Sequence, residues 1–198
     1  MKWYTAVGVK MESAGGAFCV RVGKETKNLL GVECYVWNAL LWSFVEEREV
    51  YVRMVRLLEL SFPGQPAKTD IDREEFLLCF RRLLSRGLIA FRESEDRKEA
   101  AEELLKAAYV ACVGRTWGER FLTFCEGVAC GTSLKDSLQV FKKSPLEKTR
   151  GELLREIQGS GGTGFSLEGA DQELFGKIME LHQNRLLFIR SVKEGAVA

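Results

Sequence analysis

The chain has 198 residues, of which 46% are hydrophobic and 29% charged, a composition that supports a buried core and excludes a disordered protein. Its 29 Lys and Arg residues nearly balance its 28 Asp and Glu residues, for a net charge of +1. This balance excludes the strongly positive overall field of many nucleic-acid-binding proteins, so any such binding would need a local basic patch.

The ends and cysteines of the chain bear on its cellular location. The N-terminus MKWYTAVGVK has no long apolar segment, and no run of about 18 apolar residues is present. We therefore expect no membrane span and a cytoplasmic protein. The six cysteines are expected to be free thiols in a reducing compartment: Cys19, Cys34, Cys79, Cys112, Cys125 and Cys130.

Two β-like stretches open the chain, at 3–9 and 17–22, separated by the turn residues Ser-Ala-Gly-Gly at 13–16. Apolar residues alternate along both stretches, which predicts an N-terminal β-hairpin within residues 1–30. Because an isolated hairpin is marginally stable in water, we expect it to pack on the helical core.

Two helices follow. Aromatic and aliphatic residues at helical spacing predict a largely buried helix over 32–45, and a second, amphipathic helix is predicted over 46–60. The proline- and glycine-containing stretch SFPGQPAKTD (61–70) then interrupts helical structure.

A third helix begins at Asp70 or Asp72, and Asp72 with Glu75 has the spacing of a capping box. Gly87 is typical of a left-handed helix stop, and Leu-Ile-Ala-Phe at 88–91 predicts a strand. The remaining predicted elements are helices over 96–113, 117–130, 133–143, 146–158 and 166–183 and a strand over 186–190.

An internal repeat is one interpretation of the sequence. The stretch DREEFLLCFRRLLSRGLIAF (72–91) aligns without gaps with DQELFGKIMELHQNRLLFIR (171–190), and the preceding helices correspond in type. The other interpretation is that two capped amphipathic helices give such matches by chance.

Three helices that end in FRRLLSRGLI (80–89) before a strand resemble the winged helix-turn-helix family. The resemblance covers residues 31–92 and, under the repeat interpretation, 133–191. It implies a mostly α, α+β fold of three-helix units with short strands, in addition to the N-terminal hairpin. The domains would be the hairpin (1–30), a winged-helix-like domain (31–113) and a helical region with a second such unit (114–198).

The resemblance implies a bacterial-type transcription regulator that binds double-stranded DNA as a dimer, with its third helix in the major groove. Surface cations would contact phosphate; the candidate residues are Arg81, Arg82, Arg86, Lys142, Lys143, Lys148 and Arg150. The leading turn of that helix, however, is acidic, with Asp70, Asp72, Glu74 and Glu75. The alternative is therefore a non-enzymatic module that binds a protein partner through a degenerate winged-helix scaffold.

No group of residues has the spacing of an active site, so we expect no enzyme, metal or cofactor. GSGGTG (159–164) follows a predicted helix, whereas a dinucleotide fingerprint follows a strand, so we interpret it as a connector. Cys125 and Cys130 lack the Cys-x-x-Cys spacing of zinc and redox sites. His182, the only histidine, lies beside apolar helix positions and is interpreted as a core or boundary residue.

Overall fold

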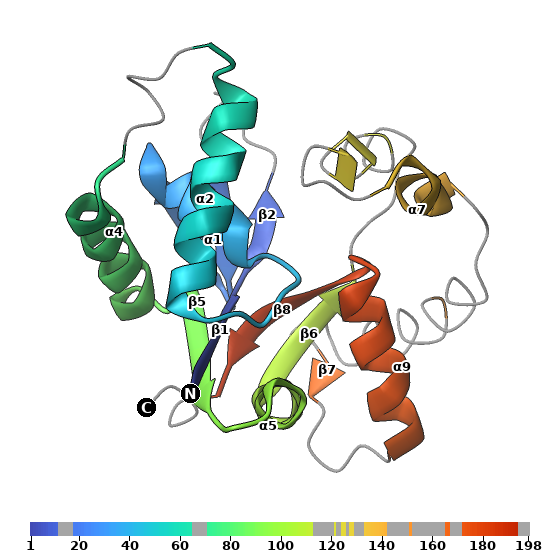
Figure 1. Ribbon diagram of the computed structural model, residues 1–198. Coiled ribbons are helices and arrows are strands. Elements are labelled where there is room, and N and C mark those ends of the chain that lie inside the picture. Colours follow the sequence, from blue (N-terminus) through green and yellow to red (C-terminus); the bar gives the residue numbers. More distant parts are fainter. Residues whose placement is uncertain are drawn as a thin grey trace.

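The architecture comes from a computed structural model of the whole chain (Figure 1). The structure describes residues 1–11, 18–64, 71–112, 133–141, 165–166 and 172–193, together with single positions between 121 and 128 and at 151. These ranges contain both helices and strands, beginning with four strands followed by three helices, so the protein is an α+β protein, as expected. No helix in the described ranges combines the length and the apolar character that a membrane crossing requires.

The N-terminal region forms three consecutive antiparallel strands, not the predicted hairpin. Strand β2 (Val9–Met11) pairs with β3 (Phe18–Val22), and β3 pairs with β4 (Glu25–Leu29). Strand β1 (Lys2–Ala6), predicted as part of the hairpin, leaves this sheet and pairs elsewhere. The chain turns between β1 and β2 at Gly8, whose φ of 113° is accessible mainly to glycine.

Three helices follow this sheet in the chain: α1 (Val32–Leu40), α2 (Glu47–Ser61) and α4 (Arg73–Ser85). The second and third helices match their predicted bounds closely, but the first is shorter than predicted, because the chain leaves the helix at Leu41 with extended φ and ψ angles. Val45, predicted to be helical, forms an isolated β-bridge with Tyr4 of β1.

Both predicted ends of α4 are confirmed. Asp72 is the N-cap, and its carboxylate accepts a hydrogen bond from the Glu75 N–H at 2.7 Å. At the other end, Gly87 has a φ of 67°, and the Leu88 N–H donates to the Leu83 carbonyl at 2.9 Å. The chain then enters strand β5 (Ile89–Glu93), which pairs antiparallel with β1.

The second half begins with α5 (Arg97–Lys106), which ends earlier than the predicted helix over 96–113. The apolar residues after it form strand β6 (Ala108–Cys112), which lies between β7 (Phe165–Ser166) and β8 (Leu187–Val192). Helix α9 (Gln172–Gln183) precedes β8, and a short helix α7 (Leu134–Ser137) runs into a 3-10 turn (Leu138–Phe141).

Two apolar clusters form the core. The first joins α1, α2 and α4 to β1, β4 and β5, and it includes Val20 of β3, which confirms that the N-terminal strands pack on the helices. The second joins α5, α9, β6 and β8, and it also takes in Val7, Phe44 and Ala90 from the first half. In Figure 1, β1 and β5 accordingly lie between the two groups of helices.

Tryptophan side chains hold distant segments together. The indole N–H of Trp3 donates to the Ser94 carbonyl, that of Trp37 to the Val7 carbonyl, and that of Trp42 to the Leu187 carbonyl. The strand pairings and these contacts cross the domain boundaries predicted at residues 30 and 113. Most of the predicted helices over 117–130 and 146–158, the whole connector GSGGTG and the last residues of the helix predicted over 133–143 lie outside the described residues.

Candidate functional site

A buried carboxylate lies at the start of α1. The side chain of Glu33 is only 5% exposed, although glutamate is almost never fully buried unless it is paired. It lies in the first turn of the helix, where the helix dipole favours a negative charge, and one carboxylate oxygen accepts from the Leu30 N–H at 3.4 Å.

Two arginines from the end of α4 neutralise this carboxylate. Arg86 Nη1 lies 2.9 Å from Glu33 Oε2, and Arg82 Nη1 lies 3.4 Å from Glu33 Oε1. Arg86 also donates through Nη2 to the Asn28 carbonyl of β4 at 2.6 Å, while Lys27 Nζ donates to the Arg86 carbonyl at 2.6 Å. These contacts fasten α4, α1 and β4 to one another.

These contacts decide which of the predicted phosphate-binding arginines remain free to contact DNA. Arg86 is 29% exposed, and its guanidinium group is already bound to Glu33 and Asn28, so it is a structural residue and is poorly placed for DNA. Arg82 is 65% exposed and keeps most of its surface open. Arg81 is exposed and forms no ion pair within the described ranges. Lys142, Lys143, Lys148 and Arg150 lie outside those ranges.

The first turn of α4 is acidic and open to solvent. Asp72, Glu74 and Glu75 are all exposed, and Arg73 is the basic residue among them. Their position suits the helix dipole, which favours carboxylates at the N-terminus. The same carboxylates would repel phosphate groups that approached this end of the helix.

Two large apolar side chains flank the Glu33 cluster. Leu30 follows β4 and is 73% exposed, and Leu78, one turn before Arg82 on α4, is 63% exposed. β4 is an outer strand of its sheet, and no strand in the described ranges pairs with its outer edge. We call this region the β4–α4 surface: strand β4 with Leu30, Leu78, Arg82 and Arg86.

Two thiols lie close to this surface and are not suited to nucleophilic chemistry. Burial raises the pKa of Cys79 above its ordinary value, and the negative charge of Glu33 raises it further. Burial followed by the Glu33 charge likewise raises the pKa of Cys34. Both thiols are therefore protonated at neutral pH, whereas reactive cysteines have a lowered pKa.

A second basic region lies on the other side of α1. Arg53 and Arg56 of α2 line a cleft of about 380 Å³ together with Arg185, which follows α9. Arg53 is paired with Glu49 at 2.6 Å, and Arg185 lies 6.0 Å from the centre of the Trp42 ring. Arg53 and Arg56 are neighbours in the sequence of α2, whereas only the fold brings Arg185 beside them.

The remaining candidates are His182 and the metal-ligating residue types. His182 is buried, as predicted for a core residue, with its ring 5.4 Å from that of Phe44. Among the residues that the structure describes, no group of three or more His, Cys, Asp or Glu side chains could hold a metal ion. The surface of the described part with the most distinctive chemistry is thus the β4–α4 surface.

Comparisons with known proteins add no family. No protein-family model matches the chain, and no curated protein or solved structure is significantly similar to it.

Proposed function

We propose that this protein is a non-enzymatic interaction module that binds an extended segment of a partner protein along the β4–α4 surface. One observation carries this proposal: the outer edge of β4 lacks a strand partner in the described ranges, Leu30 directly after β4 is exposed, and α4, which carries the exposed Leu78, is tied to β4 through Arg86. An extended peptide can add to such an edge through main-chain hydrogen bonds, while alternate side chains contact the neighbouring helix.

The chemistry of the surface defines the partner segment. Leu30 and Leu78 offer apolar contacts near the two ends of the Glu33 cluster, and Arg82 has most of its guanidinium surface free. A matching segment would carry apolar residues in alternation and at least one carboxylate facing Arg82. An exposed strand edge with large apolar neighbours is otherwise a liability for a soluble protein, which is consistent with a surface that a partner covers.

We also propose that α1, α2, α4 and β5 form a winged-helix-like unit. The support is the order of three helices followed by a strand, together with the pairing of β5 with β1 and of Tyr4 with Val45. In this arrangement β1, from the start of the chain, takes the place of the strand that would return from the wing. The pair α9–β8, with β6 beside β8, would belong to a second, incomplete unit.

Peptide selection tests the interaction directly. A displayed library of random peptides is selected on the wild-type chain and then counter-selected on Leu78→Asp. We expect enriched peptides with alternating apolar and acidic residues whose affinity falls at least about tenfold on Leu78→Asp. The matched control is Val52→Asp, which changes another exposed apolar residue, on α2, and should leave the affinity unchanged. Equal losses in both variants, or no enrichment, would contradict the proposal.

Duplex DNA is the second candidate, because Arg81 is exposed and Arg53, Arg56 and Arg185 converge on one cleft. If these cations hold phosphate, affinity must fall steeply with salt. The double variant Arg81→Ala with Arg82→Ala should then reduce the salt slope by up to roughly two, and Glu74→Gln should strengthen non-specific binding. Anisotropy titrations at two salt concentrations measure both effects, and no binding at about 50 mM salt would eliminate DNA.

A further inference from the structure

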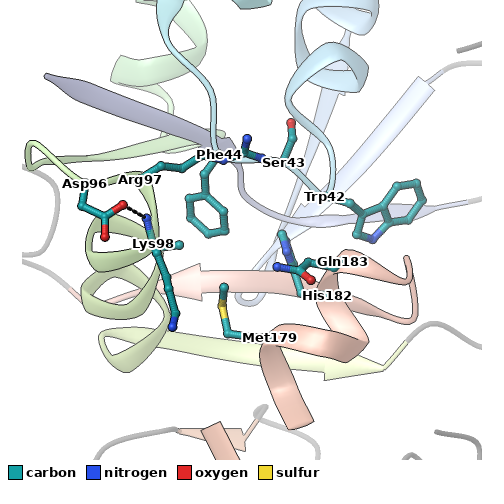
Figure 2. A pocket seen from close by; sticks show the side chains of 10 residues that line it. Trp42, Ser43, Phe44, Asp96, Arg97, Lys98, Met179, His182 and Gln183 are labelled. Atoms are coloured by element: carbon teal, nitrogen blue, oxygen red, sulfur yellow. Dashed lines mark hydrogen bonds between the residues drawn. The ribbon is translucent and has the colours of Figure 1, made fainter. Parts of the chain in front are cut away.

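A cavity of about 420 Å³ lies where the two halves of the chain meet (Figure 2). Three segments line it: the loop after α1, with Trp42 and Phe44; the first turn of α5; and the end of α9, with Met179 and His182. Its volume is within the range of small-molecule sites, which commonly occur between domains or packed helices.

The cavity has a mixed lining, in which an aromatic ring, a methyl group and a thioether lie among polar side chains. Phe44 is buried, Ala101 of α5 is buried, and the half-buried Met179 faces the same space. Figure 2 shows the Phe44 ring and the Met179 side chain between α5 and the end of α9. Aromatic rings and a polarisable thioether are favourable neighbours for a planar ring.

One buried polar side chain, the imidazole of His182, belongs to this lining. His182 is 2% exposed, and no hydrogen bond or ion pair joins its ring to another described residue. Leaving a buried polar group unpaired costs free energy, so such groups in proteins are nearly always bonded. Burial lowers the pKa of His182 to about 4, so the ring is neutral at pH 7 and offers one donor and one acceptor.

The rim of the cavity is positive. Arg97 and Lys98 open the 10-residue helix α5; both are exposed, and neither forms an ion pair with another described residue. Asp96, the one acid of the rim, caps the helix by accepting from the Lys98 N–H at 3.0 Å. The positive end of the helix dipole adds to the two side-chain charges, so an anionic group is favoured here.

We propose that this cavity binds a small aromatic carboxylate that carries a hydroxyl at the opposite end of its ring. In Figure 2, Lys98 lies on one side of the cavity and His182 on the other, with Phe44 and Met179 between them. The carboxylate would lie at Arg97 and Lys98, the ring between Phe44 and Met179, and the hydroxyl at His182. The inference is independent of the proposed protein-binding function, because it uses none of the β4–α4 residues.

The chemistry is tested on the full chain by titration calorimetry with 4-hydroxybenzoate. We expect a Kd below about 1 mM, as is usual for a ligand of this size. Benzoate, which lacks the hydroxyl, and 4-hydroxybenzamide, which lacks the charge, should each bind about 3- to 10-fold more weakly, the loss of one hydrogen bond or charge contact. Acetate should not bind measurably. No heat of binding for 4-hydroxybenzoate, or equal affinity for all three aromatic compounds, would overturn the proposal.

Variants locate the site. The double change Arg97→Gln with Lys98→Gln should weaken 4-hydroxybenzoate about tenfold while leaving 4-hydroxybenzamide unaffected, since both side chains are exposed and the fold is retained. Met179→Trp should fill the cavity and weaken every ligand. The control, Arg81→Gln, removes an exposed cation from α4 and should change nothing. Equal effects of the double change and of the control would overturn the proposal. His182→Ala, which removes the hydroxyl contact, does not alter this criterion.

Discussion

Arg86 stabilises the fold, although its type and its position on the third helix predict a contact with DNA phosphate. It binds the buried carboxylate of Glu33 and the carbonyl of Asn28, whereas Arg82 makes only the longer contact to the same carboxylate. Removing one partner of a buried ion pair leaves an uncompensated charge, and exposed pairs contribute little.

We therefore expect Arg86→Ala to lower the free energy of unfolding by about 2–4 kcal/mol and Arg82→Ala by less than about 1 kcal/mol. Urea denaturation measures both, and Arg81→Ala, which breaks no ion pair between described residues, is the control. An Arg86→Ala variant as stable as the control would show that Glu33 does not depend on Arg86.

The buried imidazole of His182 makes stability depend on pH. Burial lowers its pKa from 6.5 to about 4, so the unfolded chain binds a proton more readily than the folded one. The contribution of the neutral imidazole to the free energy of unfolding is complete above pH 6.5. It is lost as the pH falls toward 4, and the loss amounts to at most about 3 kcal/mol. In His182→Leu this loss should be absent. The free energy of unfolding of both proteins is measured at pH 7 and at pH 4, and the difference between the proteins is compared at the two pH values. This comparison cancels the effect of the carboxylates, which both proteins share. The same difference at both pH values would contradict a lowered pKa for His182.

The ends of α4 and α9 share one backbone arrangement. In α4 the Gly87 N–H donates to Leu84 and the Leu88 N–H to Leu83; in α9 the Arg185 N–H donates to His182 and the Leu186 N–H to Leu181. Gly87 and Arg185 both have positive φ, at 67° and 62°. The two helices therefore end in the same way, but the stops lie one residue out of register with the gapless sequence alignment, which pairs Gly87 with Leu186 and not with Arg185. Arg185 is strained, because a non-glycine residue rarely adopts such a φ.

Two glycine-to-alanine substitutions test this arrangement, because they are expected to change the stability of the protein in opposite directions. A Cβ at Gly87 meets no atom within 4 Å, so Gly87→Ala should destabilise through backbone strain alone, by about 1 kcal/mol. Gly176 lies inside α9, also with open space around its Cα, and Gly176→Ala should stabilise by about 0.5–1 kcal/mol. Thermal melts compare the two, and a change of the same sign in both would be inconsistent with the helix stop described here.

Local signals explain which elements could be predicted from the sequence. Asp72, Glu75 and Gly87 act on atoms within a few residues, so both ends of α4 are readable from its sequence. β6 is different: Ala108–Cys112 continues the apolar spacing of α5, and only pairing with β7 and β8 makes it a strand. The same holds for β1, which alternates like a hairpin strand but finds its partner far along the chain.

The candidate sites divide in the same way. An arginine cluster at the end of α4 is visible in the sequence, but its tie to Glu33 is not, because the two are brought together by the packing of α1 on α4. Likewise, nothing near His182 in the sequence indicates that Phe44 and the start of α5 face it across a cavity. Long-range packing is the missing information in both cases.

At the scale of the whole molecule, the N-terminal segment connects the two halves. β1 pairs with β5, the Val7 N–H donates to Leu88, and the Gly8 N–H donates to the Ile189 carbonyl at 2.7 Å. Deleting residues 1–24 removes these bonds together with Val20, a core residue. We expect the truncated chain to melt at a lower temperature or to be insoluble, and an unchanged melting curve would contradict this account.

The position of β1 also has a consequence for the order in which the chain is made. Trp3 bonds to Ser94, 91 positions later, so β1 must wait until β5 has been synthesised before it can pair. At about 5–20 residues per second, this delay lasts roughly 5 to 20 seconds. During that time β1 is an unpaired apolar strand that can associate with other nascent chains. Completion of the first half of the protein therefore depends on how soon residues 89–93 are synthesised, and a chaperone that shields the N-terminus would raise the yield of folded protein.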